Sequence, residues 1–125
     1  MKTTLTGPEW AVMSALWGKE PQTLSEVIRS MGDSVKWSYT TYATYLSKLV
    51  KKGFVGFDLK GRDKFYYPLR EQEACIREES RSLLDKMDDA AAKQLLVCMI
   101  QQSKLTKQDQ KELKALIDEL SEGSE

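Results

Sequence analysis

Hydroxyl and lysine side chains gather in one stretch of the chain, residues 36–53, in a pattern typical of a helix that contacts nucleic acid. Ser38 is a credible N-cap and Gly53 a strong stop signal, so we expect a helix between them. The stretch holds four lysines and no acidic residue. Hydroxyls can hydrogen-bond base edges and lysines can neutralise phosphates, so this composition suits the DNA major groove. The expected exposed face comprises Tyr39, Thr40, Ala43, Thr44, Ser47, Lys48, Lys51 and Lys52.

The same stretch also fits an ordinary amphipathic helix with a polar exterior, because apolar side chains recur at helical spacing on its other side. The expected buried stripe consists of Tyr42, Tyr45, Leu46, Leu49 and Val50. On this helix alone the two interpretations stay open.

The distribution of charge favours the DNA interpretation. Residues 36–64 hold seven Lys/Arg against two Asp/Glu, a net charge of +5, whereas residues 71–125 hold eight against thirteen, a net charge of −5. Such a division of charge is expected of a nucleic-acid-binding protein with an acidic oligomerisation region. The overall net charge of zero and the pI of about 6.4 therefore do not argue against DNA.

Two shorter helices are expected before this stretch. The first lies within Leu5–Trp17, with Thr6 and Glu9 as a capping box. A second capping box, Thr23–Glu26, begins a helix that ends near Met31.

A change of periodicity after the expected third helix predicts a β-hairpin. The strand-forming residues are Phe54–Leu59 and Phe65–Tyr67, joined by a Gly-containing tip. Three short helices followed by a basic hairpin is the order of a winged helix-turn-helix, in which the third helix enters the major groove and the wing reaches the backbone. The cations expected to neutralise phosphates are Lys36, Lys48, Lys51, Lys52, Lys60, Arg62 and Lys64.

Three amphipathic helices are expected in residues 71–125, and their core would be thin for an isolated domain. They could fold back on the N-terminal domain, but we favour a dimerisation region. A two-fold dimer would place two recognition helices about one DNA turn apart, ~34 Å, or a multiple of it. The residues expected at the interface are Ile76, Leu83, Met87, Leu95, Leu96, Met99, Ile100, Leu113, Leu116, Ile117 and Leu120.

The sequence therefore predicts a mainly α fold with a small β-hairpin: a winged-helix DNA-binding domain at residues 1–70 and a helical dimerisation domain at residues 71–125. Enzyme chemistry is disfavoured, since the chain has no histidine and no Gly-rich phosphate loop or nucleophile elbow. No cofactor or metal is expected. The chain also shows no apolar run of about 20 residues and no signal core, so a soluble cytoplasmic protein is expected.

The two cysteines, Cys75 and Cys98, fall in helical patterns without metal-ligand spacing. We expect both to be small buried hydrophobes, with a raised thiol pKa and little reactivity. A thiol-dependent sensor is the alternative interpretation of this pair.

Motifs along almost the whole chain resemble one family of bacterial regulators. The motifs are Leu5-Thr6, Glu9-Trp10-Ala11-Val12-Met13, Leu16-Trp17, Trp37-Ser38, Thr41, Thr44, Leu46, Lys48-Leu49, Lys51-Lys52-Gly53, Gly61-Arg62 and Phe65-Tyr66-Tyr67-Pro68. They resemble the penicillinase-repressor family (BlaI/MecI type). The match is specific in the winged-helix part, whereas the helical tail matches mainly in length and pattern.

The resemblance implies a homodimeric repressor that binds a palindromic operator of β-lactam resistance genes, with a membrane sensor-protease as a partner. It implies that Ser38, Thr41 and Thr44 lie at the base-reading or phosphate-contacting surface. It also implies a backbone contact for Lys48 and a wing contact for Arg62.

Several positions depart from the family pattern. Tyr42 and Tyr45 stand where aliphatic residues are more common, and Ala43 replaces a longer polar residue and so removes one base contact that the family pattern would offer. The family's Asn-Phe cleavage site aligns with Cys98-Met99, so these residues do not support induction by proteolysis. The tail lacks the paired Cys-x-Cys motifs of related copper-responsive repressors, which excludes copper sensing through that motif.

A second function class remains open, in which helix three and the hairpin bind an acidic protein partner. The same basic surface would serve both functions. The uncharged hydroxyl face favours DNA, because a partner-binding module has little use for Tyr39, Thr40 and Thr44 beside lysines.

Overall fold

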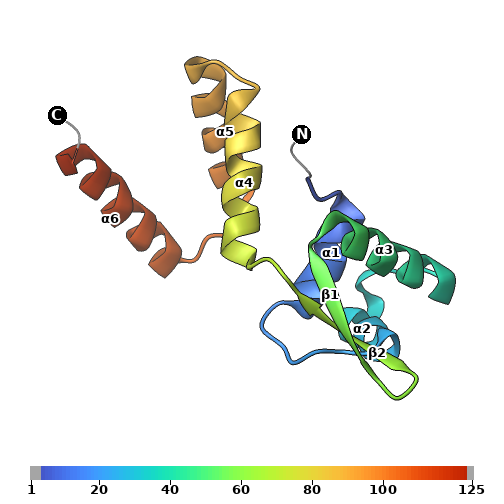
Figure 1. Ribbon diagram of the computed structural model, residues 1–125. Helices are drawn as coiled ribbons and strands as arrows, with labels where there is room; N and C mark the ends of the chain where they lie inside the picture. The colour runs from blue at the N-terminus through green and yellow to red at the C-terminus, as the bar shows by residue number, and fades with distance from the viewer. Residues whose placement is uncertain (1–3, 124–125) are drawn as a thin grey trace. The chain divides into compact units, whose positions relative to one another are not determined.

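The computed structural model describes residues 4–123, which form helices and one β-hairpin (Figure 1). The elements in chain order are α1 (Gly7–Leu16), α2 (Leu24–Met31), the 3₁₀ turn η1 (Gly32–Ser34), α3 (Tyr39–Lys52), β1 (Val55–Lys60), β2 (Asp63–Pro68), α4 (Gln72–Asp85), α5 (Asp89–Gln102) and α6 (Lys107–Gly123). This is the order of a winged helix-turn-helix followed by three helices, as predicted. Within residues 4–123, no helix is both long and apolar enough to cross a membrane.

The chain divides into two compact units, residues 1–81 and residues 82–125. The division lies within α4, eleven residues beyond the domain boundary predicted after residue 70. The first turns of α4 belong to the winged-helix unit because Cys75 is buried in its core. Continuation of one helix across a boundary leaves no hydropathy break for a sequence pattern to detect.

Local capping signals set the ends of the first three helices, and these predictions are confirmed. Thr6 and Thr23 each form a complete capping box with the glutamate three residues later. Ser38 accepts a hydrogen bond from the Thr41 N–H and caps α3. Gly53 ends α3 at φ +83°, a left-handed conformation that glycine adopts without the steric cost of a Cβ.

The core of the first unit lies where α1, α2, α3 and the base of the hairpin meet. Each helix contributes the residues on one face, as the helical spacing predicts. Tyr45 and Val50 of the expected stripe are only partly buried. The buried apolar residues are Leu5, Val12, Met13, Ala15, Leu16, Val27, Met31, Tyr42, Leu46, Leu49, Phe54, Val55 and Cys75.

The hairpin is antiparallel, with Val55 opposite Pro68 at its base and Lys60 opposite Asp63 at its tip. Gly61 and Arg62 form the two-residue turn, in which Gly61 has φ +68°. A glycine with positive φ at the first turn position is typical of a type II′ turn, which matches the twist of the strands. Phe54, expected to begin the first strand, precedes β1 and is fully buried.

The segment before α2 pairs with the hairpin, which sequence patterns did not predict. Gln22 and Tyr66 exchange two backbone hydrogen bonds, at 2.9 and 2.7 Å. The buried Gln22 side chain donates to the Ala15 C=O and accepts from the Ser30 hydroxyl. These contacts fix the wing to α1 and α2.

An ion pair joins the start of α1 to the end of α3. The Glu9 side chain is 1% exposed, and its Oε1 lies 2.6 Å from Lys52 Nζ and accepts the Thr6 N–H. Burial by itself raises the pKa of Glu9. The hydrogen bonds from Lys52 and Thr6 outweigh that effect and hold the pKa below its ordinary value.

This ion pair predicts a loss of stability in acid. A lowered pKa in the folded state stabilises the fold above the ordinary glutamate pKa of about 4.3 and stops doing so as the pH falls through the lowered value. Urea unfolding of the parent and of Glu9→Gln, which retains a capping acceptor, should show a constant difference in stability above about pH 5. Below that pH the difference should shrink. A difference that grows in acid would contradict the assignment.

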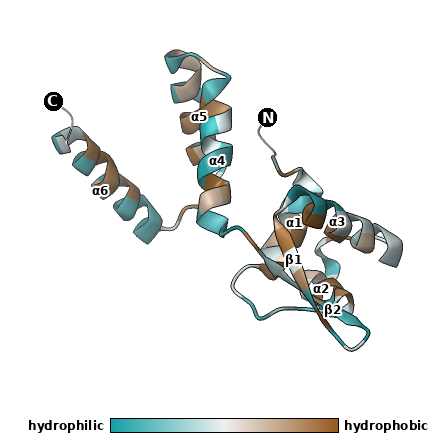
Figure 2. Cartoon of the chain, in the orientation of Figure 1, coloured by the Kyte–Doolittle hydropathy of each residue, from teal (hydrophilic) through white to brown (hydrophobic). Residues whose placement is uncertain are grey.

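The second unit is different, since no residue of α5 or α6 is buried. Asp88 caps α5, and Thr106 with Asp109 forms a capping box at α6. Apolar segments run along both helices in Figure 2. Cys98 is exposed, so its predicted burial is wrong for the single chain, whereas that of Cys75 is confirmed.

Candidate nucleic-acid interface

The exposed face of α3 carries the side chains predicted to contact DNA. Tyr39 is 63% exposed, and Thr40, Thr44, Lys48 and Lys51 are also exposed. Lys36 and Ser38, which precede the helix, are exposed. Thr41 and Ala43, within the helix, are partly buried. The helix therefore displays hydroxyls along its first turns and lysines toward its end.

The hydroxyls on this face are not equally available to a ligand. The Ser38 and Thr41 hydroxyls hydrogen-bond each other at 2.9 Å, and Ser38 also caps the helix by accepting the Thr41 N–H. Thr44 donates to the Thr40 C=O at 2.9 Å, which leaves its oxygen lone pairs free to accept. Within the described part of the chain, the Tyr39 and Thr40 hydroxyls have no hydrogen-bond partner, so they retain both donor and acceptor capacity.

Trp37 holds the two unusual tyrosines of α3 in place. Its ring lies 5.2 Å from that of Tyr42 and 4.8 Å from that of Tyr45, between centroids. The Lys48 ammonium lies 5.4 Å from the Tyr45 centroid. This cluster orients Lys48 through a cation–π contact without neutralising its charge.

The wing supplies a second set of cations. The Lys60 ammonium lies 5.3 Å from the Phe65 ring centroid, and that of Lys64 lies 4.6 Å from the Phe57 centroid. Arg62 is exposed in the turn. No ion pair to these three cations is present within residues 4–123, so their charges are available to an anionic ligand.

An open groove of about 370 Å³ separates the wing from the starts of α2 and α3. Its position between the hydroxyl face of α3 and the wing cations makes it a continuation of the same surface. Thr23 and Ser25 line the groove but were not predicted at the interface. The sequence predicted Thr23 only as a helix-capping residue. Burial, and then the nearby Tyr39, raise the pKa of Tyr66, so the Tyr66 phenol stays protonated. The groove is lined by Thr23, Leu24, Ser25, Tyr39, Arg62, Asp63, Lys64 and Tyr66.

Lys52 differs from the other predicted cations. It is 29% exposed, pairs with Glu9 and donates to the Thr4 C=O at 3.2 Å. Its charge is already balanced by a carboxylate of the same unit. We therefore assign Lys52 to the fold and keep Lys51, its exposed neighbour, in the proposed DNA surface.

The residues predicted to mediate dimerisation form incompletely covered apolar faces. Leu83, Met87, Leu95 and Leu113 are partly buried. Contiguous apolar side chains at a protein surface mark sites that a partner covers. The remaining members of the set are exposed: Ile76, Leu96, Met99, Ile100, Leu116, Ile117 and Leu120.

Comparison with known proteins decides the family. The sequence profile described as Penicillinase repressor matches residues 5–119, which covers both units. The chain belongs to the penicillinase repressor family. This family consists of transcriptional repressors and not enzymes, so the predicted functional class, a repressor and not an enzyme, is confirmed.

Individual relatives of this repressor-family chain are distant in sequence but similar in length. The methicillin resistance regulatory protein MecI of Staphylococcus aureus (strain N315) is 25% identical over 91% of this chain and 93% of its own. The penicillinase repressor of Bacillus licheniformis is 24% identical over 92% and 90%. Among solved structures, the CopR repressor is 27% identical, with a TM-score of 0.47 over 57% of this chain and all of its own.

Proposed function

We propose that this chain is a homodimeric, sequence-specific DNA-binding repressor that acts in the cytoplasm. The observation that carries the proposal is the exposed face of α3, which displays hydroxyls along its first turns and lysines toward its end, with no acidic residue in the helix. Hydroxyls contact base edges and lysines contact phosphates, so one face can supply both specificity and affinity. Family membership supports the repressor role.

The wing extends this surface to the DNA backbone. In the winged-helix arrangement the third helix occupies the major groove and the hairpin reaches adjacent phosphates. Lys60, Arg62 and Lys64 are suited to that contact because they are exposed and free of carboxylate partners within the described residues. We propose Lys36, Lys48 and Lys51 as the matching phosphate contacts from α3 and its N-terminal flank.

We propose that a second copy covers the apolar faces of α4, α5 and α6. Leu96 is 57% exposed and Leu120 is 64% exposed, which is costly for large apolar side chains that recur on one face. A two-fold dimer would present two recognition helices to a palindrome. Dimerisation is thus the proposed source of operator specificity.

A β-lactam resistance operon, or a related one, is the proposed target. The names of the relatives connect them to methicillin resistance and penicillinase. A membrane sensor-protease is the proposed signalling partner. A neighbouring gene for a multi-pass membrane protein with an H-E-x-x-H helix would support this circuit. Derepression by an unrelated small molecule, with no β-lactam response, would contradict it.

The proposed function is tested by titrating the protein against its own upstream DNA and a scrambled duplex at several salt concentrations. We expect tighter binding to the upstream sequence and an affinity that falls with salt, with a log–log slope of about −0.9 for each phosphate contacted. Binding that ignores both sequence and salt would reject the proposal. Recovery of an acidic protein instead of DNA would favour the interaction-module alternative.

Two substitutions in α3 should separate affinity from specificity. Lys51→Ala should weaken binding to all sequences alike and make the salt slope shallower by about 0.9 per protomer. Thr44→Val should reduce discrimination between sequences by about 1 kcal/mol, because a threonine makes a single contact. The same titration measures both. A Lys51 variant that changes only sequence preference would contradict the assigned roles.

A further inference from the structure

The linker between β2 and α4 is three residues long, Leu69 to Glu71, and is fixed to the winged-helix unit at two peptide groups. The Leu69 N–H donates to the Phe54 C=O at 2.8 Å. The Trp17 indole N–H donates to the Arg70 C=O, also at 2.8 Å. A short linker with both of these groups satisfied has little freedom to change direction.

The Arg70 side chain joins this linker to the second turn of α4. Its guanidinium carbon lies 4.7 Å from the centroid of the fully buried Phe54 ring. Its Nη1 donates to both carboxylate oxygens of Glu78, at 3.2 and 3.1 Å. Arg70 therefore contacts both the base of the hairpin and α4, and its planar group suits stacking and ion pairing together.

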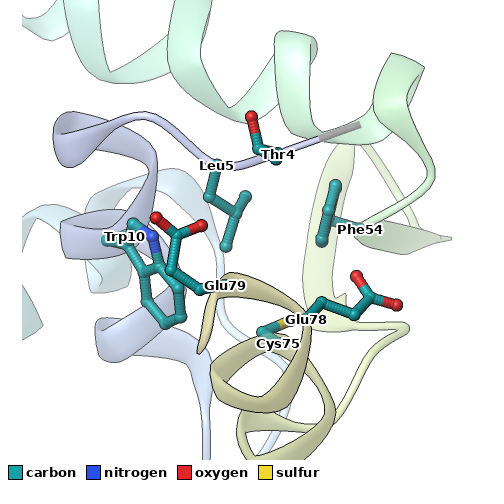
Figure 3. Close-up of a pocket in the computed structure, with 7 residues that line it drawn as sticks. All are labelled: Thr4, Leu5, Trp10, Phe54, Cys75, Glu78 and Glu79. Carbon is teal, nitrogen blue, oxygen red and sulfur yellow. The ribbon is translucent and has the colours of Figure 1, made fainter. Parts of the chain in front are cut away.

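We call the contacts among Trp17, Phe54, Leu69, Arg70 and Glu78 the joint between the hairpin and α4. Cys75 adds to this joint from the first turn of α4. Figure 3 shows it beside Leu5, Trp10 and Phe54 at a small cavity. The cavity measures about 10 Å³, at the limit for one water molecule, so it holds no effector. Burial, and then Glu78, raise the pKa of the Cys75 thiol, which keeps it protonated and unreactive. The contact is structural.

We propose that Arg70, supported by Trp17, is a positioning residue that sets the direction in which α4 leaves the winged helix. It thereby sets the spacing between half-sites that a dimer accepts. This inference rests on the proposed function. From Gln72 to Arg81, about 15 Å, α4 lies within the winged-helix unit, so a tilt of about 10° displaces this part of the helix by about 2.6 Å, most of one base-pair rise.

The ion pair itself contributes little to folding, because Arg70 is 40% and Glu78 is 57% exposed. Removing it should leave the winged helix folded and able to contact a single half-site. Its effect should appear only where two half-sites must be met together. Positioning can therefore be measured separately from stability.

The test compares the parent, Arg70→Ala and Trp17→Phe on synthetic duplexes that carry the upstream half-site once, or twice at spacings changed by up to two base pairs. The matched control is Arg77→Ala, which removes an exposed ion pair to Glu73 on the same helix. Trp17→Phe removes the indole donor while keeping an aromatic ring near Trp10.

We expect both joint variants to bind the best-spaced palindrome about tenfold more weakly and to discriminate less between spacings. Their single half-site affinity, and every value for Arg77→Ala, should match the parent. Joint variants with the parent's spacing profile, or with equal losses on half-site and palindrome, would overturn the inference alone. A parent that binds no duplex overturns the proposed function as well.

Discussion

Lys52→Met is expected to lower the free energy of unfolding by about 2 kcal/mol, less than the ~3–5 kcal/mol for a fully buried pair. The substitution keeps the aliphatic stem but leaves the carboxylate of Glu9, which is 1% exposed, without its cation. The expected loss of unfolding free energy is smaller because Lys52 is 29% exposed, so water screens the pair. Urea unfolding at neutral pH measures the change.

Lys51→Met is the matched control, one residue earlier on the same helix. Lys51 is exposed and has no carboxylate partner within residues 4–123, so its removal should change stability by less than about 0.5 kcal/mol. Its cost should appear instead in DNA affinity and salt slope. Equal stability of the two variants would contradict the assignment of Lys52 to the fold.

Leu116→Asp is expected to weaken binding to a palindromic operator by roughly 100-fold, because loss of the dimer removes the gain from linked half-sites. Leu116 is 51% exposed in the single chain, so the substitution should not disturb the winged helix. Binding to one half-site should therefore stay at the parent's value. Sedimentation of the free protein should show a protomer in place of a dimer.

Lys114→Asp provides the control for Leu116→Asp. It places the same poor helix former on α6 two residues away, where the side chain points to a different face of the helix. We expect this variant to remain dimeric and to bind the palindrome within about threefold of the parent. Monomerisation by both substitutions would contradict the assignment of the dimer contact to the apolar face of α6.

Features determined by neighbouring residues could be predicted from the sequence. Both capping boxes, the Ser38 cap and the Gly53 stop follow from side-chain to backbone contacts within three or four residues. The hairpin follows from its alternating strand formers and from the Gly61 turn. These local signals were enough to place the exposed face of α3 beside a basic wing.

Features determined by distant residues could not be predicted in the same way. Glu9 and Lys52 are 43 positions apart, and each already had a local explanation, one as a capping residue and the other as a basic residue at a helix end. Gln22 and Tyr66 pair across 44 positions. Composition treats Lys51 and Lys52 alike, and only the three-dimensional fold assigns them different partners.

The second unit shows a different limit of sequence patterns. The spacing of apolar residues predicted that Leu95, Leu96, Met99 and Ile100 form one buried face. It could not predict which surface packs against that face. The single chain leaves Leu96, Met99 and Ile100 exposed. The surface that packs against this face depends on the oligomeric state of the protein. Leu116→Asp is the proposed test of that state.

The most direct test of a dimeric operator-binding repressor is a hydroxyl-radical footprint of the purified protein on its own upstream DNA. We predict two protected patches related by a two-fold axis, with centres about one helical turn apart, 10 to 10.5 base pairs, or a multiple of it. The protection should weaken with added salt. A single patch without symmetry, or uniform cleavage at every protein concentration, would contradict a dimeric operator-binding repressor.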